Sequence, residues 1–293
     1  MSAGTELRRM LAEDRLLVAP GAYDCITARL IARAGFRAVY MTGAGTSASL
    51  GFPDYGLVTM SEMVDNARRI VGVVEVPVIA DADTGYGNEL NTVRAVQAYG
   101  RAGVAGVHIE DQTFPKRCGH LAGKEVVARA EYLAKIRAAA GERPDPDFVI
   151  IARTDARAVL GFEEAIERAN RTLEAGADVA FVEAPESMEE VEAVPRLVNG
   201  PCLLNLVRRG RTPELDLRDV ERFGYRLSIV PGLLLGTMLS SGTAALEELK
   251  ESHRHPVQLQ DLDVRERFGL LGAPEWDAVA ERYGSAAEQR AAR

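Results

Sequence analysis

Aromatic residues, cysteines and long apolar runs are all scarce in this 293-residue sequence. Aromatic side chains make up only 6% of it, and no run of about 18 apolar residues is present that could span a membrane. The three cysteines, Cys25, Cys118 and Cys202, are odd in number and form no CxxC pair, which favours a reducing compartment. The N-terminal segment lacks the apolar core of a signal peptide. We therefore expect a cytoplasmic protein without a membrane partner.

An excess of positive charge is also absent. The sequence has 35 Lys and Arg against 43 Asp and Glu, a net charge of -8. No global positive field is available to hold a nucleic acid. The remaining composition, 47% hydrophobic and 27% charged, is typical of a globular protein with a large core. A small-molecule partner is therefore favoured over nucleic acid or membrane.

Eight short apolar runs alternate with Ala- and Glu-rich helical patterns. The runs are nearly continuous rather than alternating, as expected for parallel strands covered on both faces. They span residues 16–20, 38–42, 76–81, 106–110, 148–153, 179–183, 201–206 and 226–230. No linker-like tract divides them. The pattern predicts one α/β domain over residues 1–293, a (β/α)8 TIM-type barrel, rather than two doubly wound domains.

More helix follows the eighth run than a barrel needs. Residues 236–255 are predicted to form a long helix, and residues 261–285 contain further helix, so residues 237–293 form a C-terminal helical extension. Met238, Leu239, Ala245, Leu246 and Leu249 would form an apolar stripe on the long helix. An apolar stripe of this kind is normally buried against another surface. We expect this helix to pack on a partner subunit; the alternative is that it packs on its own barrel.

Acidic residues stand at the ends of the predicted strands, where a barrel carries its active site. Asp81 and Asp83 end the third run and Glu110 ends the fourth, which also carries His108. The fifth, sixth and seventh runs end in Arg153, Glu183 and Asn205. Asp81, Asp83 and Glu110 together supply only oxygen atoms. An all-oxygen cluster of this kind is suited to a hard divalent ion such as Mg2+, which keeps several of its waters. Any one of these acids could instead cap a helix or pair with an Arg. Their occurrence on adjacent strands favours a site.

The segment 113–124 carries a cysteine in a basic setting. Cys118 is flanked by Lys116, Arg117 and His120, which predicts a lowered thiol pKa. A mobile loop here could bring the thiol over the site as an acid or a nucleophile. An incidental surface thiol is the alternative, although cysteine is usually buried. The other two cysteines are interpreted as packing residues.

Several motifs together resemble the isocitrate lyase and phosphoenolpyruvate mutase superfamily, in its shorter 2-methylisocitrate lyase-like branch. The resemblance runs from about residue 16 to about residue 235, and KRCGH at 116–120 is its most specific motif. The others are YMTGAG at 40–45, GFPD at 51–54, DADTGYG at 81–87, HIEDQ at 108–112, ARTDA at 152–156, VEAP at 182–185 and Asn205.

The resemblance implies roles for individual residues. Asp81 would be the direct ligand of Mg2+, which Mn2+ could replace, while Asp83, Glu110 and Asp54 would hold metal-bound water. Cys118 would be the general acid. The other implied catalytic residues are Arg153, Tyr40 and His108, and the implied substrate-binding residues are Thr42, Gly43, Ala44, Gly119, His120, Arg153, Glu183 and Asn205. The resemblance also implies a homotetramer in which the helix around 237–252 is swapped between barrels.

The implied reaction is cleavage of a C–C bond. A substituted 2-hydroxy di- or tricarboxylic acid, of the 2-methylisocitrate or alkylmalate type, would yield an α-keto acid and an enediolate that Cys118 protonates. The identity of the proton acceptor is left open by the sequence. Alternatives are a phosphonomutase of the carboxyphosphonoenolpyruvate type, and an oxaloacetate decarboxylase or hydrolase. A ligand-binding barrel without catalysis is less compatible with the intact set of site residues.

The segment after Asn205 departs from the 2-methylisocitrate lyases, which have a hydroxyl residue and a Glu there. Val207 would favour an alkyl branch on the substrate. Arg208, if it faced the site, would favour a distal carboxylate or phosphoryl group; a solvated loop is the equally favoured alternative. The sequence thus predicts a branched 2-hydroxy diacid rather than 2-methylisocitrate.

Overall fold

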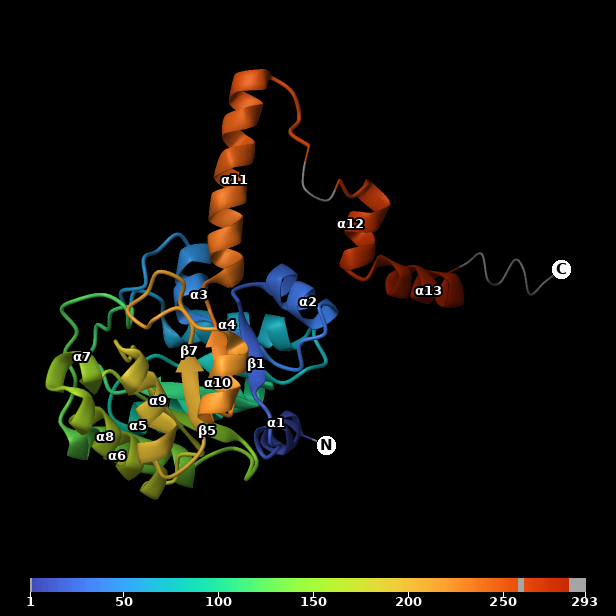
Figure 1. Cartoon of the computed structure of the whole chain (residues 1–293). Coiled ribbons are helices and arrows are strands. Elements are labelled where there is room, and N and C mark those ends of the chain that lie inside the picture. The colour runs from blue at the N-terminus through green and yellow to red at the C-terminus, as the bar shows by residue number, and fades with distance from the viewer. Residues whose placement is uncertain (1, 258–260, 285–293) are drawn as a thin grey trace. The chain divides into compact units, whose positions relative to one another are not determined.

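A computed structural model describes residues 2–257 and 261–284, which divide into two compact units. The first, here the barrel unit, spans Met1–Thr237, and the second, here the C-terminal unit, spans Met238–Arg293. Eight parallel strands of the barrel unit close into a ring in sequence order. Figure 1 shows these strands with the helices of the barrel unit packed around them. The strands are β1 (Leu17–Ala22), β2 (Val39–Met41), β3 (Val78–Asp81), β4 (Gly106–Glu110), β5 (Val149–Thr154), β6 (Val179–Val182), β7 (Cys202–Asn205) and β8 (Leu227–Val230). The predicted (β/α)8 barrel is confirmed.

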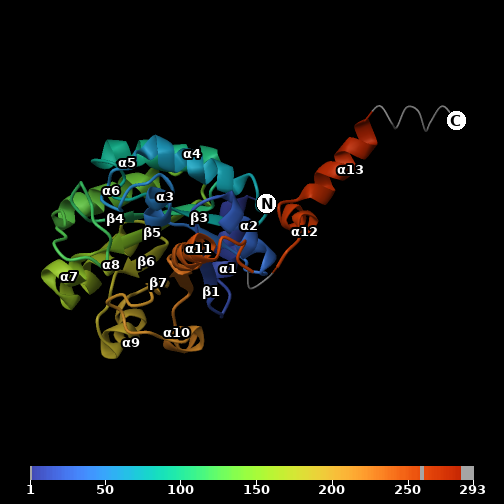
Figure 2. The same ribbon diagram turned by 90° about the horizontal axis from the view of Figure 1, so that it is seen from above.

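Helices surround the ring of strands, as the view from above shows (Figure 2). In the barrel unit they are α1 (Ala3–Leu11), α2 (Cys25–Arg33), α3 (Gly43–Ser49), α4 (Met60–Val71), α5 (Glu89–Ala102), α6 (Arg129–Gly141), α7 (Ala156–Leu160), α8 (Phe162–Glu174), α9 (Met188–Leu197) and α10 (Leu217–Phe223). Most begin at a polar cap: Asp24 and Thr59, for example, each form a reciprocal capping box, which satisfies otherwise free backbone N–H groups.

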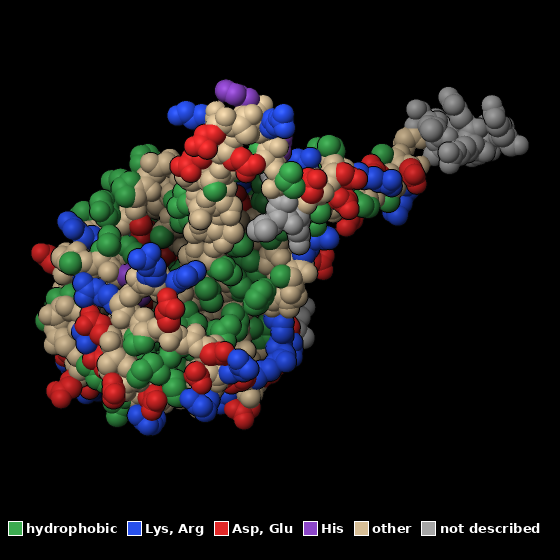
Figure 3. Space-filling model, turned by 45° about the horizontal axis from the view of Figure 1, so that its top comes forward, with side chains coloured by type: hydrophobic (Ala, Val, Ile, Leu, Met, Phe, Trp, Pro, Cys, Tyr) green, Lys and Arg blue, Asp and Glu red, His purple; other side chains and the backbone are tan. Residues whose placement is uncertain are grey.

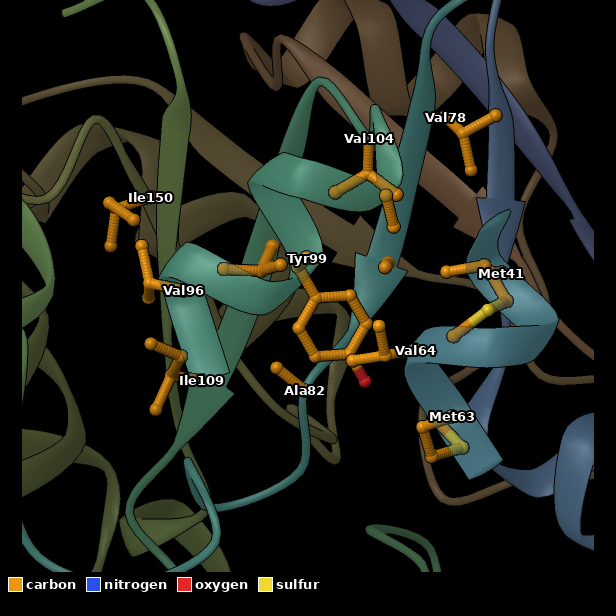
Figure 4. Close-up of a cluster of buried hydrophobic side chains, with 14 of the residues drawn as sticks. Met41, Met63, Val64, Val78, Ala82, Val96, Tyr99, Val104, Ile109 and Ile150 are labelled. Carbon is orange, nitrogen blue, oxygen red and sulfur yellow. The ribbon is translucent and has the colours of Figure 1, made fainter. Parts of the chain in front are cut away.

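Apolar side chains fill both faces of the strands, which is why the strand runs are nearly continuous in sequence. Inside the ring, Leu17, Ile151, Phe181 and Leu227 pack in one cluster with Leu7 of α1. Outside it, a second cluster joins β2–β5 to α4–α6 (Figure 4). There the ring of Tyr99 lies among apolar side chains, and its hydroxyl donates to the Asp81 backbone carbonyl over 2.9 Å. The packed core thereby fixes the end of β3.

Within the described residues, three helices follow β8. Helix α11 (Leu233–Ser252) begins in the barrel unit and continues into the C-terminal unit, which also holds α12 (Val264–Leu270) and α13 (Ala273–Tyr283). The predicted long helix is thus present, beginning three residues earlier than expected. Gly272 separates α12 from α13 in a left-handed conformation, at φ 90°, which favours glycine. Among the described residues, no helix combines the length and apolarity that a membrane span needs.

Candidate active site at the carboxyl ends of the strands

A cavity of about 120 Å3 opens at the carboxyl ends of the barrel strands. Most of the residues predicted from the sequence line it: Tyr40, Thr42, Ala44, Asp54, Asp81, Cys118, Gly119, His120, Arg153, Glu183 and Asn205. The other four lie outside this lining. Of these, Gly43 donates its backbone N–H to Asp81 over 3.1 Å, and Asp83, His108 and Glu110 are buried side chains at the ends of β3 and β4. The structure therefore gathers the predicted residues at one end of one barrel.

Strand register places the acids next to basic partners. Asp81 pairs in register with His108, and Glu110 with Arg153. The Asp81 carboxylate lies 3.2 Å from His108 Nε2, and Glu110 Oε2 lies 3.1 Å from Arg153 Nη1. Each acid thus faces a cation or an imidazole on the neighbouring strand.

The acids at this end differ in how readily they ionise. Burial opposes the charge of Asp81, but His108, Lys116 and Arg153 attract it and hold its pKa below the ordinary value. Burial dominates for Asp83 and Glu110 and raises the pKa of both, against the attraction of Lys116 and Arg153. An additional positive charge at this end would stabilise both of them in their ionised form.

A lysine lies among these carboxylates, which the sequence did not predict. Lys116 is 4% exposed; its ammonium is 2.9 Å from Asp83 Oδ1 and forms a second ion pair with Asp54. Although burial opposes its charge, the surrounding carboxylates raise the pKa of Lys116 well above its ordinary value. The KRCGH motif pointed to Cys118, and its first residue, Lys116, also lies among the carboxylates.

The oxygen set at the end of β3 and β4 fits a hard divalent cation. Both carboxylate oxygens of Glu110 and Oδ1 of Asp83 are buried and lack an oriented hydrogen bond, a costly state for a charged group. Within residues 2–257 and 261–284, no three acidic, histidine or cysteine side chains enclose an ion by themselves. Such an incomplete set suits Mg2+, which keeps water ligands, better than a metal that needs a full protein cage.

Arg153 is the centre of a second charge network. Its guanidinium forms ion pairs with three carboxylates. Nη1 contacts Glu110, Nε lies 2.9 Å from Asp155 Oδ2, and Nη2 lies 3.7 Å from Glu183 Oε1. Burial opposes the charge of Asp155, but Arg153 and Lys124 lower its pKa to about 2. Asp155 therefore stays ionised and holds the guanidinium in place, 5.4 Å from the Phe181 ring centre.

The segment 113–124 lies over the cavity, with Cys118 at its lining. Lys124 holds this segment in place. Its ammonium donates hydrogen bonds to the Gly119 carbonyl over 2.5 Å and to Asp155 Oδ1 over 2.7 Å. A Cβ on Gly119 would lie 2.2 Å from Glu183 Oε1, so the approach of this segment to β6 requires glycine. The thiol is thereby delivered beside Glu183 and Arg153.

The predicted lowering of the Cys118 pKa is wrong. Burial raises the pKa of the thiol, and nearby Asp54 and Glu183 add to the effect. The flanking cations face elsewhere: Lys116 is bound among the acids, and Arg117 lies over the Tyr55 ring, 5.8 Å from its centre. A protonated thiol is suited to donate a proton rather than to attack as a nucleophile.

The loop after β7 contributes Val207 to the cavity but not Arg208. Arg208 is exposed and lines a neighbouring hollow of about 290 Å3, so the expectation that depended on its facing the site fails. Pro231 and Leu235, which follow β8, complete an apolar wall with Val207. Neither residue carries a polar group that could have pointed to the site from the sequence.

Fold and site together define an α/β-barrel enzyme with an acidic centre at the carboxyl ends of its strands. The sequence profile described as phosphoenolpyruvate phosphomutase matches residues 7–250. The chain belongs to this family, within the PEP mutase/isocitrate lyase superfamily.

Named relatives cover most of the chain. The 2,3-dimethylmalate lyase of Eubacterium barkeri is 50% identical over 232 residues, which are 79% of this chain and 80% of that one. The 2-methylisocitrate lyase of Aeropyrum pernix is 40% identical over 291 residues, 99% and 94% of the two chains.

Solved structures of related enzymes superpose closely. Oxaloacetate acetylhydrolase with 3,3-difluorooxalacetate has a TM-score of 0.93 at 40% identity, covering 97% of both chains. Phosphonopyruvate hydrolase with oxalate and Mg2+ has a TM-score of 0.86 at 31% identity, covering 97% of this chain and 99% of that one. Enzymes of differing activity thus share this barrel.

Proposed function

We propose that this protein is a Mg2+-dependent carbon–carbon lyase that cleaves an alkyl-substituted 2-hydroxy dicarboxylic acid. The products are an α-keto acid and a carboxylic acid. The observation that carries the proposal is the small cavity with Arg153 among polar strand ends and the apolar wall of Val207, Pro231 and Leu235. The 50% identity to a 2,3-dimethylmalate lyase supports the same substrate class.

The charges of the cavity favour a dicarboxylate over a tricarboxylate. Among the described residues that line it, Arg153 is the one guanidinium or ammonium group. His120 is largely buried, and burial lowers its pKa, so it adds little positive charge at neutral pH. A third carboxylate would be desolvated without a partner, which is costly, whereas an alkyl branch can pack on the apolar wall.

Asp81, Asp83, Glu110 and Asp54 would hold Mg2+, or Mn2+ in its place. The buried, weakly satisfied oxygens of Glu110 and Asp83 support this assignment, and a structural neighbour was solved with oxalate and Mg2+. When bound, the ion supplies positive charge that stabilises an oxyanion of the substrate.

Arg153 and Tyr40 would bind the oxygens on which negative charge develops. Burial and nearby Asp81 raise the pKa of Tyr40 well above its ordinary value, so its hydroxyl stays protonated and can donate. The hydroxyl lies 2.6 Å from His108 Nε2, which orients it. Fixed donors in a water-poor cavity are expected to supply the largest part of the rate enhancement.

Cys118 would complete the reaction as the general acid. The proton of the substrate's 2-hydroxyl group passes to water as that oxygen becomes the keto oxygen. The electron pair of the broken C–C bond stays on the other fragment, which becomes an enediolate. The thiol proton of Cys118 passes to the carbon of that fragment, and the thiolate is later reprotonated from water. The raised pKa keeps this proton in place until the bond breaks. A reducing cytoplasm, the compartment we propose, keeps all three cysteines free.

The test is product formation from a panel of candidate substrates: keto acid from the 2-hydroxy acids and from phosphonopyruvate, and oxalate or pyruvate from oxaloacetate. The panel contains 2,3-dimethylmalate, other alkylmalates, 2-methylisocitrate, oxaloacetate and phosphonopyruvate, each assayed with Mg2+ and after EDTA. We expect alkylmalates to be cleaved best, and only with metal. Val207→Asp should lower kcat/KM for alkylmalates at least tenfold because the apolar wall is lost.

Two outcomes would overturn the proposal. Full turnover after exhaustive chelation would exclude the metal. Preference for 2-methylisocitrate, for oxaloacetate or for a phosphonate would replace the substrate class with that of another named relative.

We also propose a homotetramer in which α11 packs on a neighbouring subunit. None of the residues of α11 is buried, and Met238, Leu239, Leu246 and Leu249 are 44% to 68% exposed. The face drawn in Figure 3 carries a hydrophobic area bordered by charged side chains, and such areas commonly mark protein interfaces. Light scattering at micromolar concentration should give the mass of four chains, and Leu246→Glu should dissociate them; a monomeric wild-type protein would refute the assembly.

A further inference from the structure

The loop between β7 and α10, residues 206–216, contacts the segment 113–124 at His120. The segment 113–124 carries Cys118 and is called the catalytic segment below. The backbone N–H of Arg211 donates to His120 Nδ1 over 3.0 Å, and Arg211 Nε donates to the His120 carbonyl over 3.3 Å. A Cβ on Gly210 would lie 2.7 Å from His120 Nδ1. The two segments, 90 residues apart in sequence, are therefore in direct contact over the cavity.

The guanidinium of Arg211 also reaches beyond these two segments. Its Nη1 lies 2.9 Å from Glu186 Oε1, after β6. Glu186 Oε2 is held by Arg157 of α7 over 2.9 Å, and Arg157 also binds Glu190 of α9 over 2.7 Å. The guanidinium of Arg211 thus connects the catalytic segment to an ion network on two other strand–helix units.

The hydrogen bond from the Arg211 backbone N–H also determines which ring nitrogen of His120 carries the proton. Because Nδ1 accepts from the Arg211 backbone, it carries no proton, and the neutral ring carries its proton on Nε2. Nε2 lies 3.4 Å from Glu183 Oε1, at the cavity. The Nε2–H of His120 is accordingly directed at Glu183 on the cavity wall, beside the amide of Asn205, and the direction of that donor is set by the β7–α10 loop.

We propose that Arg211 is a positioning residue that latches the 113–124 segment shut and presents the Nε2–H of His120 to the cavity. The proposal rests on the proposed function for its catalytic consequence, because the latched segment carries Cys118. Its structural part is independent of any reaction.

The structural part is tested by hydrogen exchange of the full-length protein without substrate. Arg211→Ala removes the two side-chain contacts and should speed exchange within residues 113–124 about three- to tenfold, the factor expected from partly exposed hydrogen bonds. Exchange in the barrel strands should not change. Arg211→Lys, which can still reach Glu186, should lie in between. Arg208→Ala is the matched control, since Arg208 is an exposed arginine of the same loop that lines a different hollow, and it should behave as wild type.

A second variant tests the contact from the other side. Gly210→Ala places a methyl group against His120 and should open the same segment while leaving Arg211 in place. Unchanged exchange of residues 113–124 in both Arg211→Ala and Gly210→Ala would overturn the latch, as would an equal effect of Arg208→Ala.

The catalytic part is tested by turnover. With 2,3-dimethylmalate and Mg2+, Arg211→Ala should lower kcat at least fivefold with a smaller change in KM, since it disturbs closure more than initial binding. Faster exchange with unchanged kcat would overturn the positioning role. Absence of wild-type turnover would refute the proposed function while the exchange result still decides the latch.

Discussion

The buried Lys116 gives a prediction that separates the acidic cluster from the rest of the barrel. In Lys116→Met the carboxylates of Asp54 and Asp83 lose their common cation. Removing one partner of a buried ion pair costs about 3–5 kcal/mol because the other charge is left uncompensated. Lys116 is 4% exposed, so little solvent screening reduces the loss. At about 2–4 °C per kcal/mol for a domain of this size, the metal-free variant should melt about 6–20 °C below wild type.

Divalent metal should reverse most of that loss. Mg2+ at 100 times its Kd stabilises a protein by about 2.7 kcal/mol, and the variant should gain more than wild type because its acids have no competing ammonium. The assay is thermal unfolding at pH 7.5, where the carboxylates are largely ionised in the unfolded chain, with EDTA or with Mg2+.

Lys135→Met is the matched control for this experiment. Lys135 is also a buried lysine, 3% exposed, but among the described residues its ammonium forms no ion pair within 4 Å and donates to the Thr84 carbonyl over 3.3 Å. Burial lowers its pKa, so its removal should cost little and should not alter the response to Mg2+. The reasoning would be refuted if Lys116→Met melted no lower than Lys135→Met, or if its deficit were the same with and without Mg2+.

Three further predictions concern the catalytic segment. Cys118→Ser should lose about two to four orders of magnitude in kcat, the range for a general acid, while Cys25→Ser and Cys202→Ser keep turnover; near-normal kcat in Cys118→Ser would remove the acid role. Because the thiol pKa is raised, alkylation of Cys118 by iodoacetamide should rise with a midpoint above the value of about 8.5 for a free thiol, and a lower midpoint would contradict the structure. Gly119→Ala should lower kcat at least a hundredfold, because its Cβ would collide with Glu183, and it should leave the melting temperature unchanged; wild-type kcat would show that the segment closes differently.

Much of the site could be predicted because a barrel converts sequence order into position. A polar residue that ends an apolar strand must lie at the carboxyl edge, whichever helix follows it. Asp81, Glu110, Arg153 and Asn205 were all found in this way, and β4 spans residues 106–110 as expected. The resemblance to a known superfamily added Tyr40, whose place inside a strand gave no such signal.

Side chains on loops were harder to place, because a loop has no period that fixes direction. Arg208 and Arg211 have the same chemistry and lie three residues apart, yet Arg208 lines a separate hollow while Arg211 binds Glu186 and His120. Only the fold of the β7–α10 loop, with Gly210 against His120, decides between them. Apolar members of the cavity, such as Leu235, were equally hidden because an apolar residue in a helix usually reports packing.

The error over the Cys118 pKa follows from equating neighbours in sequence with neighbours in space. Coulomb energy depends on the distance between charges, and a cation that is already paired contributes little beyond its partner. Lys116 is neutralised by Asp54 and Asp83, and Arg117 lies over Tyr55, so neither stabilises a thiolate. Burial then decides, and it favours the protonated thiol. A basic motif around a cysteine therefore predicts a thiolate only where its cations have no acids of their own, and in this barrel the acids that would hold the metal also hold the lysine.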